Sequence, residues 1–599
     1  MNKMSNGKIE RLAANAIEVE ANQPNSFLIP NISKGDKGIS FDGEIQVFRD
    51  ERETVESLVG RVPVQVKGTQ VEKISSRNHS FSLSMDHYRN YYEDGGVLFL
   101  VVEVTEHTEK QVFYKHLLSK ELHTIIKNYG HQGSKSMELR PLSETTLYNA
   151  CKKFIMEREK QSRRIIENHT IGEEEFTSYS VSSLTYDPNN EATSHIFEHD
   201  FTFYGEKEGI EVPLHHGRVH AVLKEYEETI IIDEKIYKFN VQAKEELSKT
   251  SLVIEESLLV EFLDNKNGMK VNVKMLRFNC LWVQLRIIPF LIELLCGEKV
   301  YFITTSVGLC REGNDSKDFI KALEQTNSML LKLKKIFRSM GIDEKKEVGK
   351  EGDNYNQIIN SLSKLVHSIF NKDLTNLNFK DPDFSGFINL SLGDIKLLLF
   401  YDSNGKGRLI NAFSKDLLDM YKFGVINKNS TDIIDQSPYT ALNKDFAEAD
   451  NVNFDSIKKS FDRLDPFKNE GVFSRTNHFC LQCLSYYDTS GNEQVLDLVE
   501  YIYNKYYSNP NPNLNQNIIL INKLQTCFRK FKNLSDEEYY ELINLKNNSQ
   551  EDIQTQFCAS VLTQSKIEAN LYFRKMDKDI QIMYKDFPIY TLYQKLMNQ

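Results

Sequence analysis

Apolar residues at the start of the chain recur at helical spacing and then give way to the shorter runs typical of strands. A helix is predicted over residues 8–20 from four apolar positions, Leu12, Ala13, Ala16 and Ile17. β-type runs bounded by turn residues follow at residues 26–32, 39–48, 62–68, 79–84 and 97–104. The first part of the chain is therefore predicted to combine one helix with several short strands.

The run over residues 97–104 differs from the others because its core is apolar at every position. A strand with no polar alternation is typical of the centre of a sheet that helices cover on both faces. Helical patterns over residues 117–129 and 144–168 are placed to supply that cover. We therefore expect residues 1–170 to form one α/β unit.

The rest of the chain divides by composition into three parts. Residues 171–198 are polar and contain Asp187-Pro188-Asn189-Asn190, which predicts a linker. Alternating runs predict a β-rich, sandwich-like domain over residues 199–310. Residues 311–599 have mainly helical patterns, with a β-hairpin insert expected near residues 395–413. The expected fold class is multidomain α+β, with an N-terminal α/β core, a β-rich middle and a mainly helical C-terminal region.

Length and cysteine use narrow the class of protein. A chain of 599 residues has room for about three or four domains. Its most apolar segment, residues 287–296, is about half as long as a membrane-spanning helix, so we expect no membrane contact. The 8 cysteines show no regular spacing, which favours a reducing compartment. We expect a cytoplasmic protein.

The net charge of −11 argues against general coating of nucleic acid, because such binding depends on clustered Lys and Arg. Any nucleic-acid site must then be local. Candidate basic faces lie on two predicted helices, one with Lys152, Lys153, Arg158, Lys160, Arg163 and Arg164, the other with Lys332, Lys334, Lys335 and Arg338. Acidic residues are interspersed in both, so a solvated helix face is the alternative interpretation.

An acid on one predicted strand and a polar-x-lysine pattern on the next carry the most specific chemistry in the sequence. Gln65 and Lys67 are two residues apart and therefore share a strand face, with Asp42 on the preceding strand. Phosphodiester hydrolysis at neutral pH uses a divalent cation to polarise the phosphoryl oxygen and acidify a water. Mg²⁺ (or Mn²⁺) needs few protein oxygens, and we expect Asp42, the Gln65 amide oxygen and the Val66 carbonyl to bind it.

Three charged residues complete the predicted site. Lys67 is expected to orient the attacking water or to stabilise charge in the transition state. Glu18 on the first helix is expected to join the metal ligands, and Glu44, two residues after Asp42, is the competing second acid. The predicted catalytic residues are therefore Asp42, Gln65, Lys67, Glu18 and Glu44.

These residues resemble the PD-(D/E)XK phosphodiesterase superfamily, which includes restriction endonucleases and Holliday-junction resolvases. The core of that superfamily has a helix, a short antiparallel sheet, a helix and a further strand, in the order predicted above. Residues 38–44, 64–68, 86–92 and 96–102 look more closely like an uncharacterised bacterial nuclease-effector domain family found in anti-phage loci, including some beside short prokaryotic Argonautes. The resemblance covers about the first 170 residues. Gln65 stands where Asp or Glu is usual, as in Mrr-like relatives, which removes a charge from the metal site.

The resemblance implies a metal-dependent endonuclease that acts on DNA, with RNA as the other substrate, as an effector of bacterial anti-phage defence. A nuclease beside its own chromosome must be restrained, so the later domains are expected to sense a phage-derived trigger or a partner defence protein, or to regulate by oligomerisation. Cutting both strands requires two active sites, which predicts a homodimer or a larger homo-oligomer.

Two other functions stay open. Gln65 and the acidic net charge are compatible with a non-catalytic scaffold whose nuclease-like fold only binds nucleic acid or a partner. Arg164 and His169 match the Arg-x4-His spacing of HEPN ribonucleases, which cleave RNA without a metal.

Two clusters of metal-ligating residue types are interpreted as structural. Cys480 and Cys483 form a CxxC without two further ligands at suitable spacing, so buried free thiols are expected. His215, His216 and His220 have no carboxylate partner nearby in the sequence, so we expect them on a turn and a sheet face rather than on a metal ion.

Overall fold

A computed structural model describes residues 4–33, 39–76, 78–169, 171–172, 175–190, 195–265, 268–310, 317–350, 352–375, 381, 383–404, 407–426 and 433–598. The chain divides into two compact units. Unit 1 comprises Met1–Lys224, Ala243–Thr250 and Phe262–Lys270. Unit 2 comprises Glu225–Gln242, Ser251–Glu261 and Val271–Gln599.

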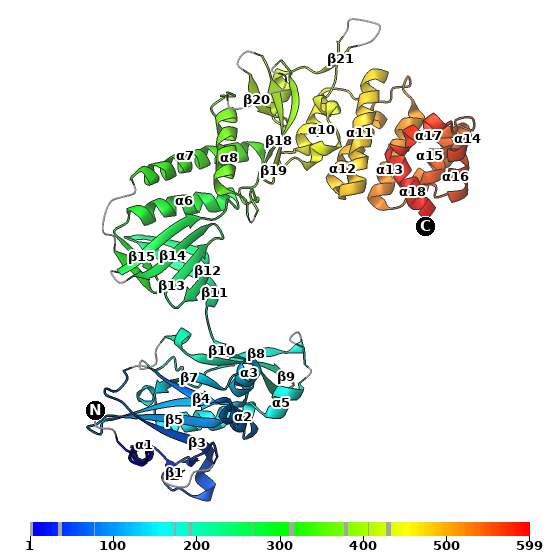
Figure 1. Ribbon diagram of the computed structural model, residues 1–599. Coiled ribbons are helices and arrows are strands. Elements are labelled where there is room, and N and C mark those ends of the chain that lie inside the picture. Colours follow the sequence, from blue (N-terminus) through cyan, green and yellow to red (C-terminus); the bar gives the residue numbers. More distant parts are fainter. Residues whose placement is uncertain are drawn as a thin grey trace. The chain divides into compact units, whose positions relative to one another are not determined.

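Unit 1 contains a seven-stranded sheet in the order β1-β2-β3-β5-β6-β7-β4 (Figure 1). Its strands are β1 (Leu28–Ile32), β2 (Gly43–Phe48), β3 (Leu58–Gln70), β4 (His79–Ser84), β5 (Val97–Val104), β6 (Lys110–Leu117) and β7 (Ser134–Pro141). β3 and β5 are parallel, whereas β1–β2, β2–β3 and β5–β6 are antiparallel. A parallel pair needs a crossover connection, and the connection from β3 to β5 includes the helix Met85–Glu93.

Helices cover both faces of this sheet. They are α1 (Asn6–Ala21), α2 (Met85–Glu93), α3 (Ser119–Tyr129) and α4 (Leu147–Lys160). α1 and α4 pack on the face that carries Val64 and Leu98, and α2 and α3 pack on the face that carries Phe99 and Val101. Every residue of β5 is buried in consequence, as predicted for a central strand.

Unit 1 has elements that the sequence pattern did not predict. The expected helix over residues 144–168 is two helices, α4 and α5 (Arg163–Asn168). The break falls at Gln161, whose side chain is buried and bonds to the Lys120 amide (3.0 Å) and the Tyr204 hydroxyl (2.8 Å) instead of continuing a helix surface. α2 is the second helix that the family resemblance implies. The hydrophobic pattern did not predict it, because its buried face consists mainly of tyrosines.

A three-stranded sheet in the order β10-β9-β8 follows in unit 1. Its strands are β8 (Ser178–Ser182), β9 (Asp200–Lys207) and β10 (Ile210–Arg218). β8 lies inside the predicted linker, residues 171–198. It is an edge strand that is exposed at four of its five positions. Its sequence alternates serine with only two apolar residues, Tyr179 and Val181, and the polar composition around it predicted a linker instead.

The β-rich middle region is confirmed as a second seven-stranded sheet, in the order β15-β14-β13-β12-β11-β16-β17. Its strands are β11 (Val222–Ile232), β12 (Lys235–Glu246), β13 (Lys249–Ile254), β14 (Leu258–Asn265), β15 (Gly268–Met275), β16 (Lys299–Phe302) and β17 (Val307–Cys310). The expected sandwich would need a second sheet on its apolar face. Here α6 (Leu281–Cys296) covers that face, and its Phe290 ring packs 4.9 Å from Phe239.

The C-terminal region is mainly helical, as predicted. After α7 (Lys317–Met340) and α8 (Tyr355–Ile369) come β18 (Gly386–Leu392), β19 (Ile395–Asp402), β20 (Arg408–Asn411), α9 (Lys415–Met420), β21 (Gly424–Ile426) and β22 (Ile433–Asp435). β19 and β20 form the expected hairpin, and β18 adds a third strand to it. Residues 405–406, between β19 and β20, lie outside the described residues.

Nine further helices occupy the end of the described chain. They are α10 (Phe454–Arg463), α11 (Glu470–Ser490), α12 (Glu493–Ser508), α13 (Gln516–Phe531), α14 (Asp536–Asn548), α15 (Ile553–Leu562), α16 (Lys566–Lys575), α17 (Lys578–Lys585) and α18 (Pro588–Asn598). Over the ranges given above, no helix reaches both the length and the apolarity that crossing a bilayer requires.

Candidate functional site

The predicted acid and amide meet where β2 begins beside β3. The carboxylate Oδ2 of Asp42 accepts hydrogen bonds from Gln65 Nε2 and from the backbone N–H of Val66, the latter at 2.8 Å. Asp42 and Gln65 are only 3% and 2% exposed. The structure therefore brings Asp42, Gln65 and Val66 together in a nearly dry environment.

An irregular turn before β2 directs the Asp42 side chain inward. Ser40 has a left-handed backbone with φ +70°, and Gly43 has φ +151°. A Cβ atom on Gly43 would lie 2.0 Å from the Asn31 carbonyl oxygen, so this position accepts only glycine. The strand predicted over residues 39–48 consequently begins only at Gly43, and the residues before it form the entry that positions Asp42.

Helix α2 holds this turn from the other side. The Ser40 hydroxyl lies 2.8 Å from His87 Nδ1 and accepts a 2.8 Å hydrogen bond from Asn90 Nδ2. The His87 ring stacks on the ring of Tyr91 at 6.1 Å. The sequence analysis identified residues 86–92 only through their family resemblance. Residues three and four apart on a helix share a face, so a helix there would have predicted that His87, Asn90 and Tyr91 lie together.

Tyr91 adds an unsatisfied polar atom to the site. The residue is fully buried, and its hydroxyl has no hydrogen-bond partner among the residues that the structure describes. Burial raises the pKa of Tyr91, and the nearby charge of Asp42 raises it further. Buried hydroxyls without a partner are rare in proteins and call for an explanation.

Lys67 lies two residues beyond Gln65 on β3, in register with Val101 of β5. Alternation along the strand places Gln65 and Lys67 on the face that α2 and α3 cover. Lys67 is half-buried, and the described part of the chain provides no ion-pair partner for its ammonium group. Among the described residues, the site thus has a cation without an acidic partner.

The two further predicted acids lie in different surroundings. Glu44 forms a 3.4 Å ion pair with Arg61 of the neighbouring strand, at the surface. Glu18 lies on α1, the helix that packs on the Val64 face of the sheet and hence on the layer opposite to Gln65 and Lys67. Neither acid has the burial of Asp42.

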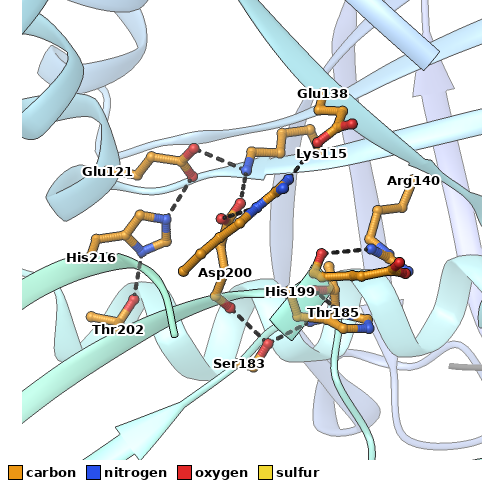
Figure 2. A network of polar contacts seen from close by, with 12 residues as sticks. Lys115, Glu121, Glu138, Arg140, Ser183, Thr185, His199, Asp200, Thr202 and His216 are labelled. Atoms are coloured by element: carbon orange, nitrogen blue, oxygen red, sulfur yellow. Dashed lines mark hydrogen bonds and ion pairs between the residues drawn. The ribbon is translucent and has the colours of Figure 1, made fainter. Parts of the chain in front are cut away.

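A second cluster of charges in unit 1 lies where β6 and α3 meet β9 and β10 (Figure 2). Lys115 Nζ is 3.0 Å from Glu121 Oε1 and 2.7 Å from Asp200 Oδ2. His216 directs Nε2 toward Glu121 at 3.4 Å, and its Nδ1 lies 2.9 Å from the Thr202 hydroxyl. Figure 2 shows the Lys115 ammonium between the two carboxylates.

Glu121, Asp200 and His216 offer ligand atoms within 4.8 Å of one another, the one group of this kind among the described residues. Burial alone would lower the pKa of Lys115, but the two carboxylates outweigh burial and hold it above its usual value. Burial likewise favours a higher pKa for Asp200, yet Lys115 lowers it to about 2. Since the ammonium stays charged, a metal ion would have to displace it.

The space beside this cluster is small. Its volume is about 40 Å³, and its lining includes Lys115, Glu121, Asp200 and His216. A buried water needs on the order of 10–15 Å³ of such volume, so the cavity has room for a few waters and not for a nucleotide. We interpret the cluster as a structural ion-pair network. His216 was expected on a sheet face, and its carboxylate partner was missed because Glu121 is distant in the sequence.

The cysteine pair and the Arg-x4-His pair from the sequence do not form a site in the structure. Cys480 and Cys483 are free and buried, as predicted, and burial raises the pKa of Cys480 to about 12. Arg164 is an exposed residue of α5, whereas His169 follows the end of that helix in an extended conformation. Those two side chains therefore do not share one regular helix face.

Three of the six residues of the first basic face form ion pairs with acids in the part of the chain that the structure describes. Arg158 lies 3.9 Å from Asp94, and Lys160 lies 3.0 Å from Glu211. Arg163 pairs with Glu93 and Glu167. This part of unit 1 consequently offers less free positive charge than the sequence suggests.

Comparisons of the chain with protein-family models, with curated proteins and with solved structures give no match. The chemistry of the first site follows from its own groups. Asp42, the Gln65 amide and the Val66 carbonyl offer oxygen ligands of the kind that a small divalent ion accepts. Lys67 on the same sheet face can stabilise negative charge, whereas Lys115 already lies between the carboxylates of Glu121 and Asp200.

Proposed function

We propose that unit 1 is a metal-dependent phosphodiesterase of the PD-(D/E)XK type that cuts nucleic acid, DNA before RNA, as an effector of bacterial anti-phage defence. The observation that carries the proposal is the meeting of Asp42 with Gln65 and Val66. Lys67 shares the β3 face of Gln65 and forms no ion pair within the described ranges. The order of α1, the antiparallel strands β1 to β3, α2 and the parallel strand β5 supports the same assignment.

Mg²⁺ or Mn²⁺ suits the donors at this site. Asp42 supplies a carboxylate, and a half-turn of the Gln65 amide would present its oxygen in place of its nitrogen. The unsatisfied Tyr91 hydroxyl favours a site that takes up a further group. When bound, such an ion polarises a phosphoryl oxygen and acidifies a water. Asp42 and Gln65 would hold the ion, and Lys67 would stabilise the charge that develops on the phosphoryl oxygens.

The proposal is tested with the full chain on plasmid DNA, single-stranded DNA and RNA. We expect cleavage with Mg²⁺ or Mn²⁺ that stops in EDTA. Lys67→Ala should lower the rate at least about 100-fold, the usual effect of removing a group that stabilises transition-state charge. Lys73→Ala, which removes an exposed lysine outside β3, is the matched control. Equal rates for Lys67→Ala and the wild type would refute the assignment.

A non-catalytic scaffold that binds nucleic acid or a partner is the second candidate. It is favoured by the near-complete burial of Asp42 and Gln65 and by the hydrogen bond that already links them. Calorimetric titration separates the two functions. Nucleic-acid binding without a heat of Mg²⁺ binding and without cleavage would favour the scaffold. Under either function, we infer that unit 2 contributes sensing, regulation or oligomerisation.

A further inference from the structure

We infer that Tyr91 is a positioning residue whose hydroxyl holds the water molecule that hydrolysis consumes. This inference rests on the proposed function and names a residue that the sequence pattern did not select. Its basis is the buried hydroxyl oxygen without a hydrogen-bond partner in the part of the chain that the structure describes. A buried polar atom of this kind usually marks an absent water, an ion or a functional group.

The surroundings of Tyr91 fix its ring in place. Phe41 packs on it at 5.3 Å, the His87 ring stacks at 6.1 Å, and Phe99 lies at 6.5 Å. The residue is completely buried in the core cluster on this face of the sheet. The ring alone would satisfy the packing, so phenylalanine would serve the fold equally well. The hydroxyl therefore needs a role other than packing.

The position of the hydroxyl suits a water beside Asp42. Phe41, the residue before Asp42, packs on the Tyr91 ring at 5.3 Å, and Asn90, the residue before Tyr91, donates to Ser40 of the same turn, so Tyr91 lies against the turn that carries Asp42. A tyrosine hydroxyl is neutral at neutral pH. A neutral hydroxyl can accept one O–H of the water while the other O–H is directed to the carboxylate. The water's lone pair is then free to face the phosphorus atom.

The reaction balances with one water and one phosphodiester. A bond forms between the water oxygen and phosphorus, and the bond from phosphorus to the leaving oxygen breaks. One water proton passes to the solvent, and the leaving oxygen takes up a proton from the solvent. Tyr91 keeps its own proton throughout, so it positions the water and is not a base.

Two neighbouring tyrosines provide a matched pair of variants. Tyr88 is on the same helix and equally buried, but its hydroxyl donates to the Lys135 carbonyl oxygen at 3.2 Å. Tyr91→Phe removes an unpartnered hydroxyl, and Tyr88→Phe removes a partnered one. Melting temperature in EDTA, Mn²⁺ affinity by electron paramagnetic resonance, and kcat and KM with Mn²⁺ are measured for both variants and the wild type.

We expect Tyr91→Phe to lower kcat about tenfold or more, as losing an orienting hydrogen bond at a hydrolytic site does. KM, Mn²⁺ affinity and melting temperature in EDTA should stay as in the wild type. Tyr88→Phe should show the reverse, a lower melting temperature with unchanged kcat. This opposite pattern distinguishes a positioning role from a structural one.

Two results overturn the inference, and they differ from the failure of the proposed function. An active wild type with an equally fast Tyr91→Phe variant shows that the hydroxyl does not position the water. A melting temperature that falls as far as in Tyr88→Phe shows that the hydroxyl has a structural partner. A wild type that binds Mn²⁺ but cuts none of the three nucleic acids refutes the proposed function itself, and the inference with it.

Discussion

Lys115→Met tests whether the charges in Figure 2 form one network. Methionine resembles the unbranched aliphatic stem of lysine and lacks its ammonium group. Glu121 and Asp200 would then face each other without the cation that lies 3.0 Å and 2.7 Å from them. We expect unit 1 to lose stability at neutral pH.

The size of the loss follows from burial. Removing one partner of a buried ion pair costs about 3–5 kcal/mol, because the remaining charge stays desolvated. The side chains of Lys115 and Glu121 are 13% and 14% exposed, whereas Asp200 is 32% exposed and partly solvated. The fall in the Asp200 pKa from 3.8 to about 2 is by itself equivalent to about 2 kcal/mol. The lower end of the range, about 3 kcal/mol, is therefore expected.

The loss should depend on pH with a definite sign. In the wild type, the pKa of Asp200 is lowered from its ordinary value of 3.8 to about 2. This shift stabilises the folded state fully when the pH is above 3.8, and the stabilisation is lost as the pH falls toward about 2. In Lys115→Met, burial is no longer opposed by the ammonium and raises the carboxyl pKa values, so the folded variant takes up protons at a higher pH than the wild type does. The difference between the two proteins should consequently be larger at pH 7 than at pH 4.

Hydrogen exchange measured by mass spectrometry on peptides of β6, α3 and β9 reports this loss directly. Fluorescence would not, because the only tryptophan, Trp282, belongs to unit 2. Lys127→Met removes an exposed lysine of α3 and should change the free energy of unfolding by less than about 0.5 kcal/mol. A loss below about 1 kcal/mol in Lys115→Met, or an equal loss at pH 4 and pH 7, would refute the network.

Two further substitutions test other buried groups. Gln65→Glu places a second carboxylate against Asp42. Thermal melting in EDTA should show that the free energy of unfolding falls by about 1–3 kcal/mol, and Mg²⁺ should partly restore it. A stability that does not change with Mg²⁺ would argue against a metal site there. Arg529→Met breaks the 2.7 Å pair between Arg529 (2% exposed) and Asp488 (6% exposed), so urea unfolding followed by circular dichroism should show a loss of about 3–5 kcal/mol. Arg475→Met on exposed α11 surface is its control, and equal losses in both variants would contradict the ion-pair argument.

Local patterns predicted the framework of unit 1 well. The apolar run of β5 identified a central strand because no partly exposed strand has that composition. The pattern around Gln65 and Lys67 identified a strand with two polar residues on one face, and β3 contains both. These features depend on neighbours in the sequence, which is why the sequence alone predicts them.

Features that depend on distant residues were not predictable in the same way. Glu121 and His216 share one ion pair although the chain between them forms several strands and helices. β8 pairs with β9, but its own apolar side chains, Tyr179 and Val181, are exposed and do not enter a core. The turn at Ser40 depends on His87 and Asn90 of α2, so no local pattern could show where the Asp42 carboxylate points.

The two clusters of unit 1 differ in a way that bears on function. Around Lys115 the ammonium and the carboxylates of Glu121 and Asp200 lie within ion-pair distance, so an ion bound there must break these pairs. Around Asp42 the fold pairs the carboxylate with Gln65 but provides neither an ion-pair partner for Lys67 nor a hydrogen bond for Tyr91 within the ranges that the structure describes. Folding alone does not favour unpaired polar groups, because pairing or apolar replacement would be more stable. Their presence together on one sheet face is therefore the reason to place the chemistry at Asp42 and the structural role at Lys115.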